Sequence, residues 1–140
     1  MIFVDSCYII ALMNKKAKKH KEALELLSVI ENESTLINST VLLEMLNNLK
    51  KKRYESNRQN IIKLLFNMDN IYYLNESDYN ESLEMCKYYN YSVNYSDCTI
   101  IKTMEKYNVT NIVSFDGDFD KVKGINRIYL WTSIWKSLFI

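Results

Sequence analysis

Short apolar runs alternate along the chain with longer segments in which apolar residues recur every three or four positions. Runs of this length, bounded by polar or charged residues, are typical of buried strands in a sheet that is covered on both faces. Five such runs are present, and they predict strands at residues 2–4, 36–37, 71–74, 112–115 and 128–130.

The segments between these runs have the spacing of amphipathic helices, in which apolar residues form one stripe. The helices they predict lie around residues 23–30, 42–49, 61–68, 83–85 and 100–104. Strands that alternate with helices long enough to cross over favour an α/β fold. We therefore expect a mainly parallel central sheet of about five strands, flanked by helices on both faces. Since no linker or repeat interrupts the chain, residues 1–140 are predicted to form a single domain.

The composition is that of a globular protein, with 48% hydrophobic and 25% charged residues. The first residues lack the pattern of a signal peptide, and no apolar run is long enough to span a bilayer. We therefore expect a cytoplasmic protein without a membrane partner. The three cysteines, Cys7, Cys86 and Cys98, lack the spacing of a metal site and are interpreted as small buried residues.

Two acidic residues follow predicted strands at the point where each strand ends. Asp5 comes directly after the first run, and Asp116 follows the run at 112–115. In open parallel sheets ligands bind beyond the carboxyl ends of the strands, so both side chains are expected at the same edge. Burying two carboxylates there is unfavourable unless they are paired, capped or bound to a metal ion.

Two further acids have less specific surroundings. Asp97 lies in the first turn of a predicted helix, on the same face as Ile100 and Met104, where an N-terminal capping interaction explains it as well as chemistry does. Glu44 shares a polar helix stripe with Asn48, and this pattern alone favours a solvent-exposed position.

Together these acids lie in four motifs that resemble those of the PIN-domain family. The opening Ile-Phe-Val-Asp-Ser-Cys-Tyr-Ile-Ile-Ala-Leu resembles the family's first motif, a strand that ends in Asp followed by Ser or Thr and an apolar helix. Ser-Thr-Val-Leu-Leu-Glu at 39–44 is similar to the second motif, Ser-Asp-Cys at 96–98 to the third, and Ile-Val-Ser-Phe-Asp-Gly-Asp-Phe at 112–119 to the fourth. Their order and spacing match over essentially the whole chain.

The resemblance implies a metal-dependent ribonuclease. Its catalytic and metal-binding residues would be Asp5, Glu44, Asp97 and Asp116, which would hold one or two Mg²⁺ or Mn²⁺ ions. Oxygen ligands suit these hard cations, whereas zinc sites usually recruit His or Cys. By the same resemblance the enzyme would hydrolyse RNA with an activated water, leaving 5′-phosphate and 3′-hydroxyl ends. Asp118 is expected either to help hold a second ion or to cap a loop.

Partners also follow only from the resemblance. Small PIN domains of this size look like the VapC-like toxin ribonucleases, which usually form homodimers and are silenced by an antitoxin protein. We therefore expect an RNA substrate, an antitoxin and a homodimer. A housekeeping ribonuclease that processes rRNA or tRNA, and a non-catalytic module that binds RNA or protein, remain as alternatives.

Charge and the C-terminal sequence add two open questions. The net charge of +1 hides an uneven distribution, because 13 acidic residues outside the four motif positions face 18 basic ones. The run of four basic residues at 50–53 either contacts phosphates or complements the dipole at a helix end. Residues 131–138 have Trp131, Ile134, Trp135 and Leu138 on one helical stripe, which would pack on the domain or meet a partner.

Overall fold

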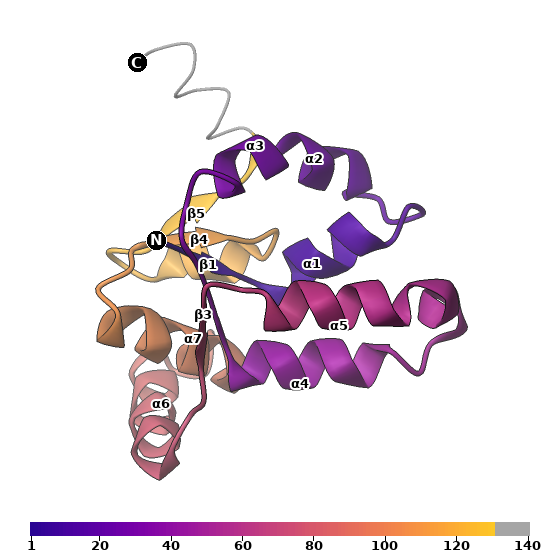
Figure 1. Cartoon of the computed structure of the whole chain (residues 1–140). Helices are drawn as coiled ribbons and strands as arrows, with labels where there is room; N and C mark the ends of the chain where they lie inside the picture. Colours follow the sequence, from indigo (N-terminus) through magenta and orange to yellow (C-terminus); the bar gives the residue numbers. More distant parts are fainter. Residues whose placement is uncertain (131–140) are drawn as a thin grey trace, which may run out of the picture.

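The computed structural model describes residues 1–130 and contains a five-stranded sheet with helices on both faces (Figure 1). Its strands are β1 (Ile2–Val4), β2 (Thr35–Asn38), β3 (Asn70–Tyr72), β4 (Asn111–Val113) and β5 (Asn126–Ile128). They lie in the order β3-β2-β1-β4-β5, and every neighbouring pair is parallel. The predicted α/β architecture is therefore confirmed.

Seven α-helices and two 3₁₀ helices connect these strands within the described part of the chain. They are α1 (Ser6–Met13), α2 (His20–Glu25), α3 (Leu27–Ile30), α4 (Ser39–Asn48), η1 (Lys52–Asn57), α5 (Arg58–Phe66), α6 (Glu76–Tyr88), α7 (Tyr95–Lys106) and η2 (Gly117–Lys121). The chain moves outward from β1 to β2 and on to β3, and then returns past β1 to β4. Right-handed crossovers consequently place α1, α4 and α5 on one side of the sheet and α6 and α7 on the other (Figure 1).

The central strand β1 is buried at all three positions, which explains its uninterrupted apolar sequence. Phe3 is fully buried and pairs in register with Leu36 of β2 on one side and Ile112 of β4 on the other. Packing on both faces therefore fixes β1, and with it the position at which the chain leaves the sheet after Val4.

The predicted strands at 71–74 and 112–115 are too long at their carboxyl ends. In the structure β3 ends at Tyr72, and the Leu74 amide donates to the hydroxyl of Ser39 instead of to a neighbouring strand. Similarly β4 ends at Val113, and the Phe115 amide donates to the sulfur of Cys7. Beyond the last ladder hydrogen bonds Tyr73 is exposed, and Leu74 and Phe115 are only partly buried. These residues extend the apolar pattern without extending the strand, and periodicity alone does not separate the two situations.

Other predicted boundaries also shift. The last strand, predicted at 128–130, occupies Asn126–Ile128. Instead of the single helix expected around 23–30, the structure has two short helices, α2 and α3. Leu26 is the C-cap of α2 and the N-cap of α3. The stripe from Trp131 to Leu138 lies outside the described residues. Within the described part, no helix combines the length and the apolar character needed to cross a membrane.

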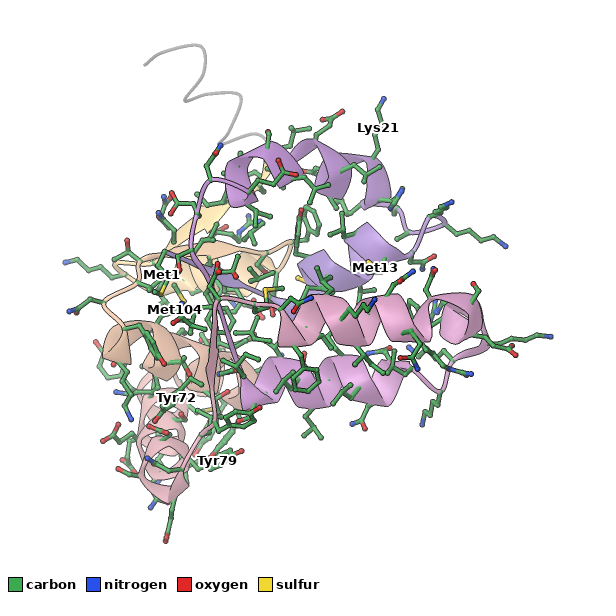
Figure 2. All side chains as sticks on the ribbon, in the orientation of Figure 1. Met1, Met13, Lys21, Tyr72, Tyr79 and Met104 are labelled. Carbon is green, nitrogen blue, oxygen red and sulfur yellow. The ribbon has the colours of Figure 1, made fainter. Side chains whose placement is uncertain are left out.

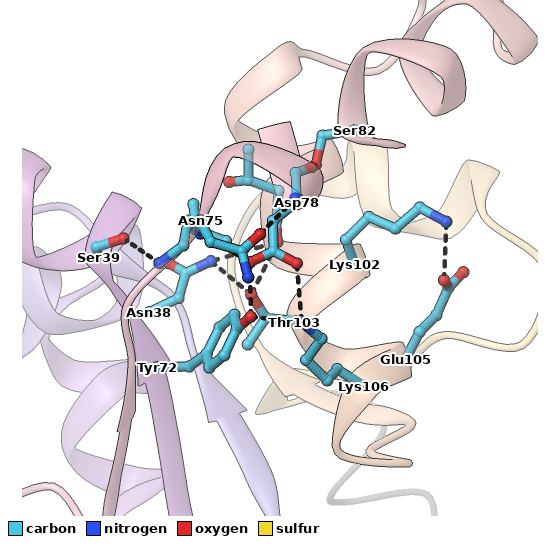
Figure 3. Close-up of polar contacts among 12 residues, drawn as sticks. Asn38, Ser39, Tyr72, Asn75, Asp78, Ser82, Lys102, Thr103, Glu105 and Lys106 are labelled. Carbon is cyan, nitrogen blue, oxygen red and sulfur yellow. Dashed lines mark hydrogen bonds and ion pairs between the residues drawn. The ribbon is translucent and has the colours of Figure 1, made fainter. Parts of the chain in front are cut away.

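A polar network holds β3, α6 and α7 together (Figure 3). The carboxylate of Asp78, almost fully buried, accepts hydrogen bonds from the hydroxyl of Tyr72 at 2.6 Å and the amide of Asn75 at 2.9 Å. It also forms an ion pair with Lys106 at 3.0 Å. Burial by itself raises the pKa of Asp78, but these hydrogen bonds outweigh it, so that the pKa lies below its ordinary value. The network is fully satisfied and serves the packing of α6 on α7.

Candidate active site

The carboxyl edge of the sheet carries the acids that follow β1 and β4. Asp5 is the N-cap of α1, is buried, and accepts a hydrogen bond of 2.8 Å from the amide of Ser6. Asp116 caps η2 and accepts a hydrogen bond of 2.9 Å from the amide of Asp118. Both caps direct a carboxylate to the end of its strand because the chain turns into a helix immediately afterwards.

Ser114 connects these two acids. Its hydroxyl donates to Asp5 Oδ2 at 2.7 Å and accepts from the amide of Asp116 at 3.0 Å. The Cys7 sulfur lies 3.3 Å from the same Asp5 oxygen and 3.3 Å from the Ser114 hydroxyl. The orientation of Asp5 is therefore fixed by side chains from both α1 and the loop after β4.

Glu44 turns inward and contacts the start of α1. It is half-buried, and its Oε2 accepts a short hydrogen bond from the hydroxyl of Ser6. The helix that carries Glu44 is capped by Asn38, whose side chain accepts from the amide of Val41. The solvent-exposed position that the helix pattern favours for Glu44 is thus wrong, because packing of α4 on α1 brings the side chain against Ser6.

Asp97 is the least satisfied acid of the group. It is buried in the first turn of α7, and its Oδ2 has no hydrogen-bond partner. Asn94, not Asp97, is the N-cap of this helix. An unpartnered buried carboxylate oxygen is unfavourable by itself, and it requires a cation or a proton for compensation.

The nearest neighbours of Asp97 are two other carboxylates. One oxygen from each of Asp97, Asp116 and Asp118 lies within 4.8 Å of the other two, although Asp118 also pairs with Lys121 at 2.9 Å. Asp5 and Glu44 lie near enough to Asp97 to repel its charge. The structure thus brings together all four predicted site residues and adds Asp118 to them.

Mutual repulsion and burial disturb the titration of this cluster. Burial, followed by the charges of Asp116 and Asp5, raises the pKa of Asp97 to about 8. Burial also raises the pKa of Asp5 against the hydrogen bond from Ser114, and that of Glu44 against the one from Ser6. Near neutral pH the cluster therefore retains a proton unless a cation takes its place.

The donor set fits a hard divalent cation. It consists of carboxylate oxygens, and the described residues place no histidine among them. The one soft donor, Cys7, is kept as a neutral thiol because burial and the charge of Asp5 raise its pKa to about 12. The unpartnered oxygen of Asp97 is the observation that most directly indicates a position for a cation.

Three further residues of the site, Ser6, Cys7 and Ser114, hold the carboxylates but have ordinary residue types. Of these, only Ser6 had a signal in the sequence, as the Ser that follows Asp in the first motif. Cys7 was interpreted as a small buried residue, and Ser114 lay inside the predicted strand at 112–115. Their contacts join residues 38 to 109 positions apart, which a local pattern does not contain.

The fold matches a known class of proteins. The family model described as the PIN domain matches residues 2–125, and the chain therefore belongs to the PIN-domain family. A sequence search among curated proteins finds no match.

Solved structures with the same fold include toxins. The chain is similar to VapC20 of Mycobacterium tuberculosis, described as a sarcin-ricin loop cleaving toxin, with a TM-score of 0.77 and 18% identity over 92% of this chain and 99% of that one. It is also similar to a chain of VapBC2 from Rickettsia felis, which was crystallised with a DNA fragment from its promoter, with a TM-score of 0.66 and 20% identity over 92% and 99% of the two chains. A toxin–antitoxin complex from Klebsiella pneumoniae gives a TM-score of 0.65 and 16% identity over 90% and 96%. At these identities the similarity concerns the fold.

Proposed function

We propose that this protein is a metal-dependent endoribonuclease and the toxin of a toxin–antitoxin pair. The observation that carries the proposal is the state of Asp97: its buried Oδ2 has no hydrogen-bond partner, and one of its oxygens lies within 4.8 Å of oxygens from both Asp116 and Asp118 at the carboxyl edge of the sheet. Membership of the PIN-domain family and the fold shared with VapC20 support the same reaction class. An enzyme that acts on cellular RNA works in the cytoplasm, which is the location we propose.

The metal ligands we propose are Asp5, Glu44, Asp97 and Asp116, with Asp118 as an additional ligand for a second ion. When bound, Mg²⁺ or Mn²⁺ supplies positive charge against the scissile phosphate and lowers the pKa of the attacking water. To serve as a ligand, Asp97 would give up its proton, so that its carboxylate would face the cation as an anion.

The remaining residues of the site position these carboxylates. Ser114 and Cys7 hold Oδ2 of Asp5, the Ser6 amide holds its Oδ1, and the Ser6 hydroxyl holds Oε2 of Glu44, so that the orientation of both carboxylates is fixed. Such neighbours typically change metal affinity by a factor of about 10 to 100 when they are removed. The protein thus supplies a rigid carboxylate frame, and hydrolysis separates the RNA into 5′-phosphate and 3′-hydroxyl ends.

Cleavage of a structured RNA tests the enzymatic part. The purified chain is incubated with RNA in Mg²⁺, in Mn²⁺ and in EDTA, alongside Asp5→Asn, Asp97→Asn and the surface control Glu84→Gln. We expect cleavage by wild type and Glu84→Gln in either metal, and none in EDTA or with the two Asn variants. Activity that persists in both Asn variants would overturn the mechanism.

Expression in a bacterial host tests the toxin role. Induction of the wild-type chain alone should arrest growth, induction of Asp97→Asn should not, and co-expression of the neighbouring gene's product should restore growth if it is the antitoxin. Active enzyme that leaves growth unaffected would instead point to a processing ribonuclease. The expected homodimer is measured by light scattering of the purified chain at several concentrations.

A further inference from the structure

One end of the molecule carries about half of the basic residues of the described chain. The turn after α1 with the start of α2, and the turn after α4 with the start of η1, contribute nine exposed cations to it. We call this set the basic end; its members are Lys15, Lys16, Lys18, Lys19, Lys21, Lys50, Lys51, Lys52 and Arg53. Only one acidic residue, Glu55, lies within residues 14–21 and 50–57.

The two turns lie side by side in the fold although they are far apart in the sequence. Lys15 and Lys16 from the first turn and Arg53 from the second line the same shallow pocket of about 210 Å³. In Figure 1 both turns lie at the end of the molecule where α1 and α4 finish, and Figure 2 labels Met13 near the end of α1, with Lys21 apart from it on α2 at the top of the view. The two groups of cations therefore meet at this end of the molecule.

The charges of this surface are not neutralised within the described residues. Among the nine cations, Lys19 alone forms an ion pair, with Glu22 at 3.2 Å. Elsewhere in the described chain pairing is more frequent, and five cations have acidic partners: Lys87 with Glu84, Lys102 with Glu105, Lys106 with Asp78, Lys121 with Asp118 and Arg127 with Asp120. An unneutralised cluster of this size creates a strong positive potential.

The basic end is connected to the acid cluster by the helices that carry two of its members. Asp5 caps α1, Glu44 lies on α4, and both helices run from the cluster toward the basic end. The eight residues of α1 span about 12 Å. Lys19 extends back toward the cluster, since its Nζ lies 5.9 Å from the ring centroid of Phe115, the neighbour of Asp116.

We propose that the basic end binds the phosphate backbone of the RNA substrate about four nucleotides from the point of cleavage, taking about 3.4 Å per nucleotide of a stacked strand. The inference rests on the proposed ribonuclease function for the identity of the polyanion. Exposed lysines suit contacts with phosphates, which position a nucleic acid without reading its sequence. An RNA too short to reach from the acids to the basic end gains nothing from this surface.

Binding without cleavage separates this inference from the proposed reaction. Fluorescence anisotropy in EDTA, at several salt concentrations, measures the affinity of the full chain for RNAs of about 12 and about 3 nucleotides. The longer RNA can reach from the acid cluster to the basic end, and the shorter one cannot. The test variant is the triple substitution Lys16→Gln, Lys51→Gln, Lys52→Gln. The matched control Lys63→Gln, Lys87→Gln, Lys123→Gln removes the same charge from exposed positions elsewhere. Thermal melting checks that both triples remain folded.

We expect the test triple to bind the longer RNA about tenfold more weakly than the control triple, with no difference for the shorter RNA. Its plot of log affinity against log salt should be shallower by about 2, because each lost contact with single-stranded RNA removes about 0.7 from the slope. Equal losses in the two triples would overturn the proposal, as would a loss confined to binding of the antitoxin. Charge-dependent RNA binding by a chain that never cleaves RNA would support the basic end and refute the ribonuclease.

Discussion

Replacing Asp97 by asparagine should make the metal-free protein more stable at pH 8. The carboxyl has an ordinary pKa of 3.8, and burial together with Asp116 and Asp5 raises it to about 8 in the folded protein. Between these values the folded chain keeps a proton that the unfolded chain has lost. The free energy of unfolding of the wild-type protein therefore falls as the pH rises through this window. In the Asp97→Asn variant the side-chain amide does not titrate, so this contribution to the pH dependence is absent.

The size of the effect follows from the pKa difference. At about 1.4 kcal/mol per pKa unit, a shift from 3.8 to about 8 corresponds to an upper value of about 6 kcal/mol at pH 8. Because part of this free energy arises from repulsion between neighbouring charges and does not belong to Asp97 alone, we expect the substitution to change the stability by about 2 kcal/mol. For a chain of this length that is about 6 °C in melting temperature.

Thermal melting in EDTA at pH 5 and pH 8 measures this difference. At pH 8 Asp97→Asn should melt above wild type, and at pH 5 the two should melt at closer temperatures because both side chains are neutral in the folded state. The exposed substitution Glu84→Gln should leave the melting temperature unchanged at both pH values. A wild-type protein as stable as Asp97→Asn at pH 8 would refute the reasoning.

Adding metal should reverse the order of stability. At a concentration about 100 times the dissociation constant, a ligand that binds only the folded state adds about 2.7 kcal/mol. Wild type should gain this stabilisation from Mn²⁺ or Mg²⁺ at pH 8, whereas Asp97→Asn, which lacks a charged ligand, should gain little. A reversal of the order of stability between EDTA and metal is expected only if Asp97 is a metal ligand. A residue that contributes to packing alone would not produce it.

Three further substitutions test the surroundings of the site. Ser114→Ala should weaken Mn²⁺ binding by about 10 to 100-fold in calorimetric titration because Asp5 loses its orienting hydroxyl, while Ser114→Thr, which keeps it, should bind nearly normally. Asp78→Asn should lower the free energy of unfolding, measured in urea at pH 7, by about 1 to 3 kcal/mol. Because the pKa of Asp78 is lowered in the folded state, the difference between the variant and wild type should shrink as the pH falls below about 4. Tyr8→Phe removes a buried hydrogen bond of 2.8 Å to a carbonyl of α2 and should cost about 1 kcal/mol in the same assay.

Much of the fold was predictable because its signals are local. A buried strand such as β1 needs only three apolar residues before a polar one, and the alternation with helical stripes already implied a parallel sheet. Strand ends were less predictable. Leu74 and Phe115 continue the apolar runs, but their amides bond to Ser39 and Cys7, which no periodicity indicates.

The order of the elements, and the edge of the sheet at which Asp5 and Asp116 lie, followed from the sequence alone, because the chain leaves each parallel strand at the carboxyl edge. The resemblance to the PIN-domain motifs also placed Glu44 and Asp97 among the expected site residues. The packed structure was needed to establish that Glu44 turns against Ser6, that one oxygen of Asp97 lacks a partner, and that Asp118 joins the cluster. Helical periodicity fixes the face of a helix on which a side chain lies, but what that face meets depends on how separate helices pack across the sheet.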